Sequence, residues 1–255
     1  MIRDSEIKKR ARKNGVPAST IERDYTQSWF LKNLANDDML LKGGTGIKKV
    51  YFDDYRFSDD LDFTLVKRLD KDDFRILIKE AIEKTVNESG INFEEDFKID
   101  EVKNGFKIEV YFRILRTSGS PLKIKIDMTD TDKEKVVLSP EYRKIFHSYS
   151  DQIDEKVKCY PLEEIIAEKI RSLFERTRPR DLYDIWKLYE KIDEDTVEDV
   201  LKEKCDFKEI ERELDELQGR EEDYQNSWEN SLKHQMEEVP EFEDVFDYVL
   251  NEVLI

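Results

Sequence analysis

Residues 40–65, LLKGGTGIKKVYFDDYRFSDDLDFTL, hold the residue types and spacings best suited to chemistry in this chain. Asp60 and Asp62 lie two residues apart in an alternating segment, and on a strand such side chains point to the same face. Leu61 and Phe63 would then point into the core. Two adjacent carboxylates repel each other, and magnesium is often held by one or two carboxylates together with substrate phosphates. The pair therefore predicts a metal site for nucleotide chemistry.

A glycine turn precedes this pair. Gly43, Gly44 and Thr45 follow a short apolar run, so backbone N–H groups at a helix start could approach a phosphate closely. The same residues also suit a plain strand-to-helix turn, and the GxxxxGK[ST] pattern of a P-loop is absent from the sequence. The hydroxyls of Thr45 and Ser58 could bind a phosphate oxygen or cap a helix. The position of the turn before the carboxylate pair favours a phosphate-binding turn.

A third carboxylate follows a predicted β-hairpin. Residues 106–112 and 122–126 alternate between apolar and polar types, and the turn residues 118–121 lie between them. The second strand ends at Asp127. If that strand neighbours the aspartate pair, three carboxylates from two strands could hold two metals, one for the attacking hydroxyl and one for the triphosphate leaving group. The alternative for Asp60 and Asp62 is that they form only an exposed acidic edge, because the chain has many other aspartate pairs.

Further charged residues lie in the second half of the chain. Lys169 is in the middle of the predicted helix AEKIRSLFER, where it could neutralise a triphosphate or simply be solvated. Arg176, Arg178 and Arg180 form a small basic cluster in an acidic chain, which suits contact with an anion. Asp181 and Asp184 are spaced i, i+3 on one helix face. They could fix Arg176 or Lys169, or serve catalysis directly.

Periodicity and turn residues predict the elements that position these side chains. Strands are expected at 39–41, 57–66, 106–112 and 122–126. Helices are expected at 1–15, at 20–35 after Ser19 as N-cap, at 45–51, 70–88 with Gly90 as the stop, 161–176 and 180–192. At least three more acidic helices follow, with breaks near 205–207, Gly219 and Pro240. The sequence predicts an α+β part over residues 1–155 and a helical part over residues 156–255.

Composition limits the class of protein. The 255 residues include 44 Lys and Arg and 61 Asp and Glu, a net charge of −17, yet 38% are hydrophobic, which is enough for a folded core. Such acidity disfavours nonspecific nucleic-acid binding over the whole surface but permits a local basic patch or a basic protein partner. His147 and His234 are isolated in the sequence, which argues against a nucleophilic triad.

Location also follows from composition. Cys159 and Cys205 match no metal-ligand spacing and are expected to be reduced thiols. No apolar run approaches the roughly 20 residues that span a bilayer. The charged N-terminus has no apolar segment behind it, so no signal peptide is expected. These features predict a cytoplasmic protein without membrane contact.

Several segments together resemble the AbiEii-type nucleotidyltransferase toxins. These are the toxin half of type IV toxin–antitoxin and abortive-infection systems, within the DNA polymerase β-like nucleotidyltransferase superfamily. The matching pieces occur in the family's order and cover roughly residues 20–190. They are IERDY (21–25), LKGGTGIKKVY (41–51), RFSDDLDF (56–63), KIDM (125–128) and EKIRSLFERTRPRDLYDIW (168–186).

The resemblance implies an α+β fold in which a nucleotidyltransferase-like mixed sheet carries the metal site beside a helical C-terminal part. It implies transfer of a nucleotide from an NTP to an acceptor, dependent on Mg²⁺ (or Mn²⁺). In some relatives the acceptor is tRNA, so an RNA acceptor is expected here. A cognate antitoxin protein would restrain the activity.

The resemblance also assigns roles by motif position. Those residues are Gly43, Gly44 and Thr45 with Ser58 for the phosphate turn, Asp60 and Asp62 for the metal pair, Lys169 for the triphosphate, and Asp181 or Asp184 to complete the catalytic site. Arg180, from the basic cluster, is a further candidate for contact with the nucleotide. Asp127 is the candidate third metal ligand. A register slip would expose Asp59 instead of Asp60, but it would also turn Leu61 and Phe63 towards the metal, which disfavours it.

Two other classes of protein fit some of these features. A metal-dependent nuclease could use the same carboxylates without an NTP, although it has no need for the Gly-Gly-Thr turn as a second phosphate cradle. A catalytically silent interaction module is the other alternative. The acidic segments 209–222 and 237–247 could dock a basic partner or simply be solvated.

Overall fold

The computed structural model describes residues 1–254, which form two compact units. The first holds Met1–Lys133 and Pro140–Tyr160, and the second holds Glu134–Ser139 and Pro161–Ile255. The chain therefore passes from one unit to the other three times. The domain division that the sequence predicts, with an α+β domain over residues 1–155 and a helical domain over residues 156–255, stays a prediction.

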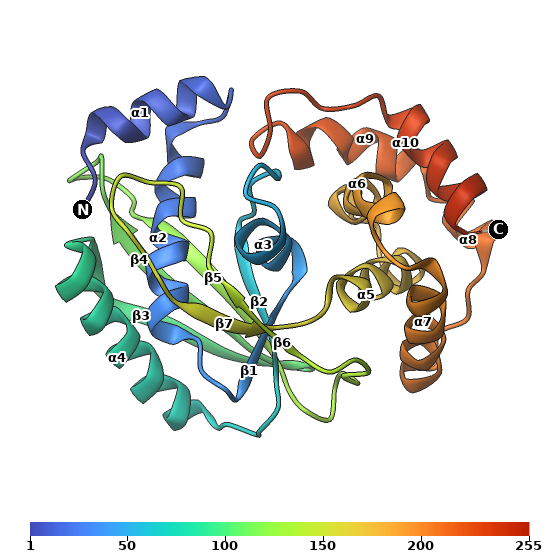
Figure 1. The fold of residues 1–255 in the computed structure, drawn as a ribbon, viewed down its shortest axis with the longest axis horizontal. Coiled ribbons are helices and arrows are strands. Elements are labelled where there is room, and N and C mark those ends of the chain that lie inside the picture. Colours follow the sequence, from blue (N-terminus) through green and yellow to red (C-terminus); the bar gives the residue numbers. More distant parts are fainter. Residues whose placement is uncertain (255) are drawn as a thin grey trace. The chain divides into compact units, whose positions relative to one another are not determined.

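A seven-stranded mixed sheet forms the centre of the first unit, in the order β3-β4-β5-β2-β1-β7-β6 (Figure 1). The strands are β1 (Met39–Lys42), β2 (Asp60–Leu65), β3 (Asn92–Val102), β4 (Gly105–Arg113), β5 (Leu122–Thr129), β6 (Glu141–Lys144) and β7 (Lys156–Cys159). Strand β2 is central, because it pairs antiparallel with β1 and parallel with β5. This sheet and its helices confirm the predicted α+β class.

Alternation in the sequence found the central strands but not the outer ones. β4 and β5 pair antiparallel as the predicted hairpin, and Ile108, Val110 and Ile126 are fully buried. Strands β3, β6 and β7 are not among the strands that the sequence predicts. β3 is an edge strand with mostly exposed side chains, and β6 and β7 have only four residues each. Their strand state depends on pairing partners more than on a local pattern.

Four helical segments accompany the sheet in the first unit. They are α1 (Asp4–Lys13), α2 (Ala18–Leu34), α3 (Gly43–Gly46), which continues as the π-helical turn η1 (Ile47–Tyr51), and α4 (Lys71–Ser89). α2 contacts α1, α4 and β5, and twelve of its 17 residues are buried. Ser19, the expected N-cap, lies inside α2, because the helix begins directly after Pro17.

α4 begins and ends where the sequence indicates. The Asp70 side chain accepts from the backbone N–H groups of Asp72 and Asp73, and the Asp73 side chain accepts from the Asp70 N–H, which makes a capping box. At the other end Gly90 adopts φ 73°, a left-handed conformation that glycine adopts without steric cost. Local sequence signals therefore define both ends of this helix.

The second unit is helical, apart from the short segment Glu134–Ser139. Its helices are α5 (Leu162–Glu175), α6 (Pro179–Leu188), η2 (Tyr189–Lys191), α7 (Glu194–Lys208), α8 (Leu214–Gln218), α9 (Glu221–Leu232), α10 (Phe242–Tyr248) and η3 (Val249–Val253). The break expected near 205–207 occurs slightly later, because α7 continues to Lys208 and its C-cap is Glu209, with φ 54°. The breaks at Gly219 and Pro240 are confirmed.

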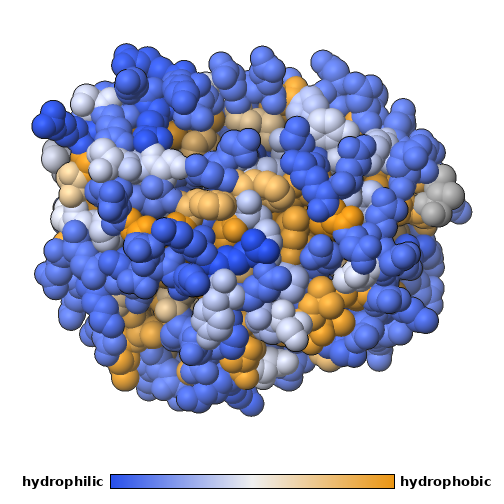
Figure 2. All heavy atoms as spheres, viewed as in Figure 1, coloured by the Kyte–Doolittle hydropathy of each residue, from blue (hydrophilic) through white to orange (hydrophobic). Residues whose placement is uncertain are grey.

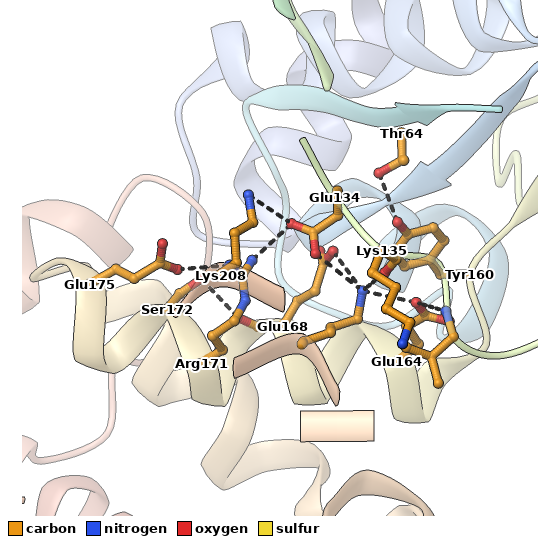
Figure 3. A network of polar contacts seen from close by, with 12 residues as sticks. Thr64, Glu134, Lys135, Tyr160, Glu164, Glu168, Arg171, Ser172, Glu175 and Lys208 are labelled. Atoms are coloured by element: carbon orange, nitrogen blue, oxygen red, sulfur yellow. Dashed lines mark hydrogen bonds and ion pairs between the residues drawn. The ribbon is translucent and has the colours of Figure 1, made fainter. Parts of the chain in front are cut away.

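A buried ionic network ties residues 134–139 to the helices of the second unit (Figure 3). Nζ of Lys204, on α7, is 2.9 Å from a Glu164 oxygen, 3.2 Å from Glu168 and 3.4 Å from Glu134. Arg171 also pairs with Glu134, at 2.9 Å. The Glu164 carboxylate accepts from two backbone N–H groups of the segment, each at 2.9 Å. Ion pairs of Glu134 with Lys204 and Arg171, and hydrogen bonds to the Glu164 carboxylate, thus hold this segment against the helices.

Candidate active site

The aspartate pair has the register that alternation predicts. On β2, Leu61 and Phe63 are fully buried, whereas Asp60 and Asp62 are partly exposed on the opposite face. Asp59 lies just before the strand, and its carboxylate oxygen is 2.7 Å from Nη1 of Arg23. The strand therefore presents Asp60 and Asp62 together, while Asp59 is used in an ion pair.

Asp127 lies beside this pair on the neighbouring strand. β5 runs parallel to β2, and Asp127 is in register with Asp62, as Lys125 is with Asp60. Among residues 1–254, however, no three His, Cys, Asp or Glu side chains are placed to hold a metal ion. The structure thus brings Asp127 next to the pair without assembling a three-carboxylate cage, and its role as a ligand stays a prediction.

Asp60 and Asp62 nevertheless suit magnesium. This ion demands oxygen ligands and keeps several waters, and it is usually bound through one or two carboxylates plus substrate phosphates rather than by an all-protein cage. Two partly exposed carboxylates on one face of a strand supply that number of protein ligands. A third carboxylate is not required for such a site.

The glycine turn is packed directly against the pair. Gly43 adopts φ +69°, and a Cβ atom at this position would lie 2.4 Å from Oδ2 of Asp62. A Cβ atom on Gly44 would lie 3.0 Å from Oγ of Ser58 and 3.0 Å from Nη2 of Arg56. Glycine is needed here for both conformation and close approach. The structure therefore brings the predicted phosphate turn, Asp62 and Ser58 to one place.

Thr45 has a structural role within this turn. Its side chain is fully buried, and its hydroxyl donates a hydrogen bond to the backbone oxygen of Asp60. This bond ties the start of the helix after the turn to the start of β2. Of the two hydroxyls considered from the sequence, Ser58 is the one that lies against Gly44.

Helix α2 contributes residues whose contacts the sequence analysis missed. Glu22 accepts from the backbone N–H of Leu115 at 2.8 Å, and Arg23 pairs with Asp59. Tyr25 donates to Asp151 at 2.7 Å. In the sequence these residues were only part of the motif IERDY. The available signal is a run of three charged residues, Glu22, Arg23 and Asp24, in a helix whose later part contains the bulky apolar residues Trp29, Phe30 and Leu31.

Asp24, in the same motif, forms a buried ion pair with Lys49. Nζ of Lys49 is 2.7 Å from Oδ1 of Asp24, and the two side chains are 2% and 6% exposed. Burial acts to raise the pKa of Asp24, but the positive charges of Lys49 and Lys48 outweigh it and hold the pKa below its ordinary value. Because Lys49 belongs to the helix after the glycine turn, this pair attaches that helix to α2.

Lys169, Asp181 and Asp184 meet inside the second unit. Nζ of Lys169 is 2.9 Å from Oδ1 of Asp181 and 2.7 Å from Oδ2 of Asp184, and all three side chains are buried. Arg176 approaches Asp181 at 3.5 Å. Burial acts to raise the pKa of Asp181, but Lys169 and Arg176 outweigh it and lower the pKa. Both aspartates thus pair with Lys169, and Asp181 also pairs with Arg176, while a direct catalytic role of Asp181 or Asp184 stays a prediction.

Arg180 lies in the first turn of α6 and is partly exposed. It directly precedes Asp181 in α6, whereas Lys169 lies in α5. The residues 43–62 of the candidate site belong to the first unit, and Lys169, Arg180, Asp181 and Asp184 belong to the second.

The fold is that of a nucleotidyltransferase. One similar solved structure is MenT4, a nucleotidyltransferase toxin from Mycobacterium tuberculosis H37Rv, with a TM-score of 0.57 and 19% identity over 79% of this chain and 69% of that chain. A nucleotidyltransferase-like antigenic protein from Paracoccidioides brasiliensis matches with a TM-score of 0.36 and 17% identity, over 66% of this chain and 73% of that chain. No curated protein matches the sequence.

The chain belongs to the AbiEii family. The model of this family, described as nucleotidyl transferase AbiEii toxin of a type IV toxin–antitoxin system, matches residues 28–251. This confirms the resemblance drawn from the motifs and gives the class of the protein as a nucleotidyltransferase toxin. In residues 1–254 there is also no helix with the length and apolar character needed to cross a membrane.

Proposed function

We propose that this protein is a magnesium-dependent toxin that transfers a nucleotide from an NTP to an RNA acceptor. The observation that carries the proposal is the contact between the glycine turn and the aspartate pair, in a chain of the AbiEii family. An acceptor hydroxyl would form a bond to the α-phosphorus, the bond to the bridging oxygen would break, and pyrophosphate would leave.

Asp60 and Asp62 would hold the metal, with Asp127 beside Asp62 as a further oxygen ligand. When bound, magnesium would neutralise charge on the attacking hydroxyl and on the leaving phosphates. Manganese accepts the same oxygen ligands and could replace it. The two carboxylates would orient the ion on one face of β2.

Gly43 and Gly44 would bind the phosphates through backbone N–H groups, since they admit a close approach, and Ser58 would add a hydroxyl donor. Thr45 would hold the turn against β2 through its bond to Asp60. In the second unit, Lys169 would contact the triphosphate from a position fixed by Asp181 and Asp184. Arg180 would contribute a second positive charge near the nucleotide.

The acceptor and the partner of this reaction are further parts of the proposal. We propose an RNA acceptor from the motif resemblance, and tRNA is the first acceptor to test. A cognate antitoxin protein would restrain the toxin, as the type IV description implies. NTPs and tRNA are cytoplasmic substrates, and we assign the activity to the cytoplasm.

Incubation with each α-labelled NTP, magnesium and total cellular RNA tests the proposal. Label should enter RNA with the wild-type protein, and chelation by EDTA should stop it. The variant Asp60→Ala/Asp62→Ala should transfer no label. Glu221→Ala/Asp223→Ala, which removes two exposed acids at the same spacing on α9, should transfer as the wild type does.

The other classes of protein give different results in this experiment. Shortened RNA without incorporation, in the absence of any NTP, would replace the proposal with a nuclease. Neither incorporation nor cleavage, together with no detectable metal binding, would indicate a catalytically silent interaction module.

A further inference from the structure

The outer face of α1 is a basic surface that the proposed chemistry does not use. Residues 1–13 contain six Lys and Arg against two acidic residues, in a chain whose net charge is −17. Five of these cations are exposed, and we call them the α1 basic face; they are Arg3, directly before the helix, and Lys8, Lys9, Arg12 and Lys13 on it. None of the five forms an ion pair within residues 1–254. In the view of Figure 2, strongly hydrophilic side chains gather over the position of α1.

Local charge of this kind matters because the protein is acidic. A polyanion is repelled by a surface of net negative charge and binds where cations are concentrated, releasing its counterions. Arg10, the sixth cation, has a different role, since it pairs with Glu6 at 3.1 Å and its guanidinium lies 4.6 Å from the centre of the Tyr149 ring. Within the described residues, the other five charges therefore have no intramolecular ion pair and are open to solvent.

An apolar anchor for a membrane is lacking on this helix. Basic amphipathic helices that bind membranes insert an apolar face into the lipid. The apolar residues here are already used in the core, where Ile2, Ile7 and Ala11 are 5%, 0% and 7% exposed. The exposed side of α1 therefore has several positive charges and no apolar face, and such a surface suits the repeated phosphates of a nucleic acid.

The position of α1 links this face to the candidate site. The helix packs against α2, and the backbone N–H of Ile2 donates to the Tyr25 hydroxyl at 3.3 Å. Two residues earlier on α2, Arg23 pairs with Asp59 at 2.7 Å, directly before Asp60. The basic face and the aspartate pair are thus connected through one buried helix of the same unit (Figure 1).

We propose that the α1 basic face binds the phosphate backbone of the RNA acceptor. This inference rests on the proposed function, because it assigns the surface to the acceptor of that reaction. Such binding requires no base-specific contact, because ion pairs between cations and phosphates do not depend on the base sequence. The bound backbone would hold the acceptor beside the unit that carries Asp60 and Asp62.

Equilibrium binding of fluorescent tRNA without NTP or magnesium tests the proposal at several salt concentrations. The test variant is Lys8→Gln/Lys9→Gln/Arg12→Gln/Lys13→Gln. Its affinity should be lower than that of the wild type by about tenfold or more at low salt, and the slope of log K against log salt should become shallower by about 2 to 3. The side chains are exposed, so the variant should unfold at the wild-type temperature.

A matched variant removes the same number of exposed charges elsewhere in the first unit. Lys71→Gln/Lys79→Gln/Lys84→Gln/Lys103→Gln should keep the wild-type affinity and slope. Equal losses in both variants, no loss in the α1 variant, or no salt-dependent binding by the wild type would each overturn the inference. So would wild-type binding to anionic lipid vesicles that is lost in the α1 variant while tRNA binding persists.

Failure of the proposed function remains distinguishable from failure of this inference. The binding measurement involves no transfer step, so absence of labelled product with the wild type would overturn the function while an altered salt slope would still support the surface. Conversely, if the α1 variant kept the wild-type salt slope while the wild type transferred label normally, only the inference about the α1 basic face would be overturned. If the proposed function and this inference both hold, the α1 variant should have a higher KM for RNA than the wild type and the same KM for NTP.

Discussion

Nη1 of Arg23 lies 2.7 Å from Oδ1 of Asp59, the residue directly before the first carboxylate of the candidate metal pair. The same guanidinium donates through Nε to the backbone oxygen of Lys123, at 3.3 Å. Asp59 leads into β2, and Lys123 is the second residue of β5, so one side chain from α2 holds the two strands that carry Asp60, Asp62 and Asp127. Arg23 is therefore a positioning residue for the site.

Replacing Arg23 should lower activity more than stability. The pair is partly exposed, so Arg23→Met should change the free energy of unfolding by about 1 kcal/mol or less. A displacement of the reacting groups by about 1 Å can reduce a rate by about 100-fold. We expect a loss in kcat approaching that size with little change in the KM for NTP. Arg75→Met, which removes the exposed pair with Asp72, serves as control, and an unchanged kcat would refute the positioning role.

Gly43 should not tolerate a methyl group. In Gly43→Ala the new Cβ atom would meet Oδ2 of Asp62 at 2.4 Å, so the carboxylate must move, and transfer should fall by about 100-fold or more. Gly119→Ala is a matched control, because Gly119 has φ +84° and nothing within 4 Å of its ideal Cβ position. Both variants incur the strain of a positive φ, and only the first should lose activity in single-turnover transfer assays.

Removal of Lys49 should destabilise the first unit strongly. Lys49→Met leaves the buried carboxylate of Asp24 without its cation, which typically costs about 3–5 kcal/mol. Asp24→Asn/Lys49→Met should recover part of that loss, since the charge is also removed. Lys32→Met, which breaks an ion pair with Glu88 at a more exposed position, should cost less than about 1 kcal/mol. Urea unfolding measures all three, and equal losses for Lys49 and Lys32 would contradict the expectation.

His147 should make stability depend on pH. Burial lowers the pKa of this imidazole, although its Nε2 atom is 2.8 Å from Asp151. The unfolded chain therefore takes up a proton more readily than the folded one below the unfolded pKa of about 6.5, and the free energy of unfolding should fall as the pH decreases from there. His147→Gln should flatten this slope, whereas His234→Gln should keep it. A slope that survives in His147→Gln would assign the effect to another group.

Lys204 should be essential for the stability of the second unit. Lys204→Met would leave the buried Glu134 and Glu164 and the partly buried Glu168 with one fewer cation and release the contact to the backbone oxygen of Lys135 at 2.7 Å. A cost of about 3–5 kcal/mol is expected. Lys202→Met, two residues earlier on the exposed side of α7, should be nearly neutral. Similar melting temperatures for the two variants would show that the network contributes little.

Local sequence determined much of the candidate site. The register of Asp60 and Asp62 followed from the alternation with Leu61 and Phe63, because an apolar side chain on a strand gains free energy only on the core face. The ends of α4 followed from Asp70 and Gly90 in the same local way. In such cases the interacting residues are a few positions apart, so the pattern contains both partners.

Only the tertiary structure decided which distant residues complete these elements. Arg23 meets Asp59, Tyr25 meets Asp151, and Lys204 meets Glu134, and nothing in local periodicity pairs residues separated by 36, 126 and 70 positions. Periodicity reports which face of a helix is buried, whereas charges inside a helix buried on all sides must find partners elsewhere in the packed chain. The sequence by itself therefore determined the carboxylates and the turn, and packing decided what holds them in place.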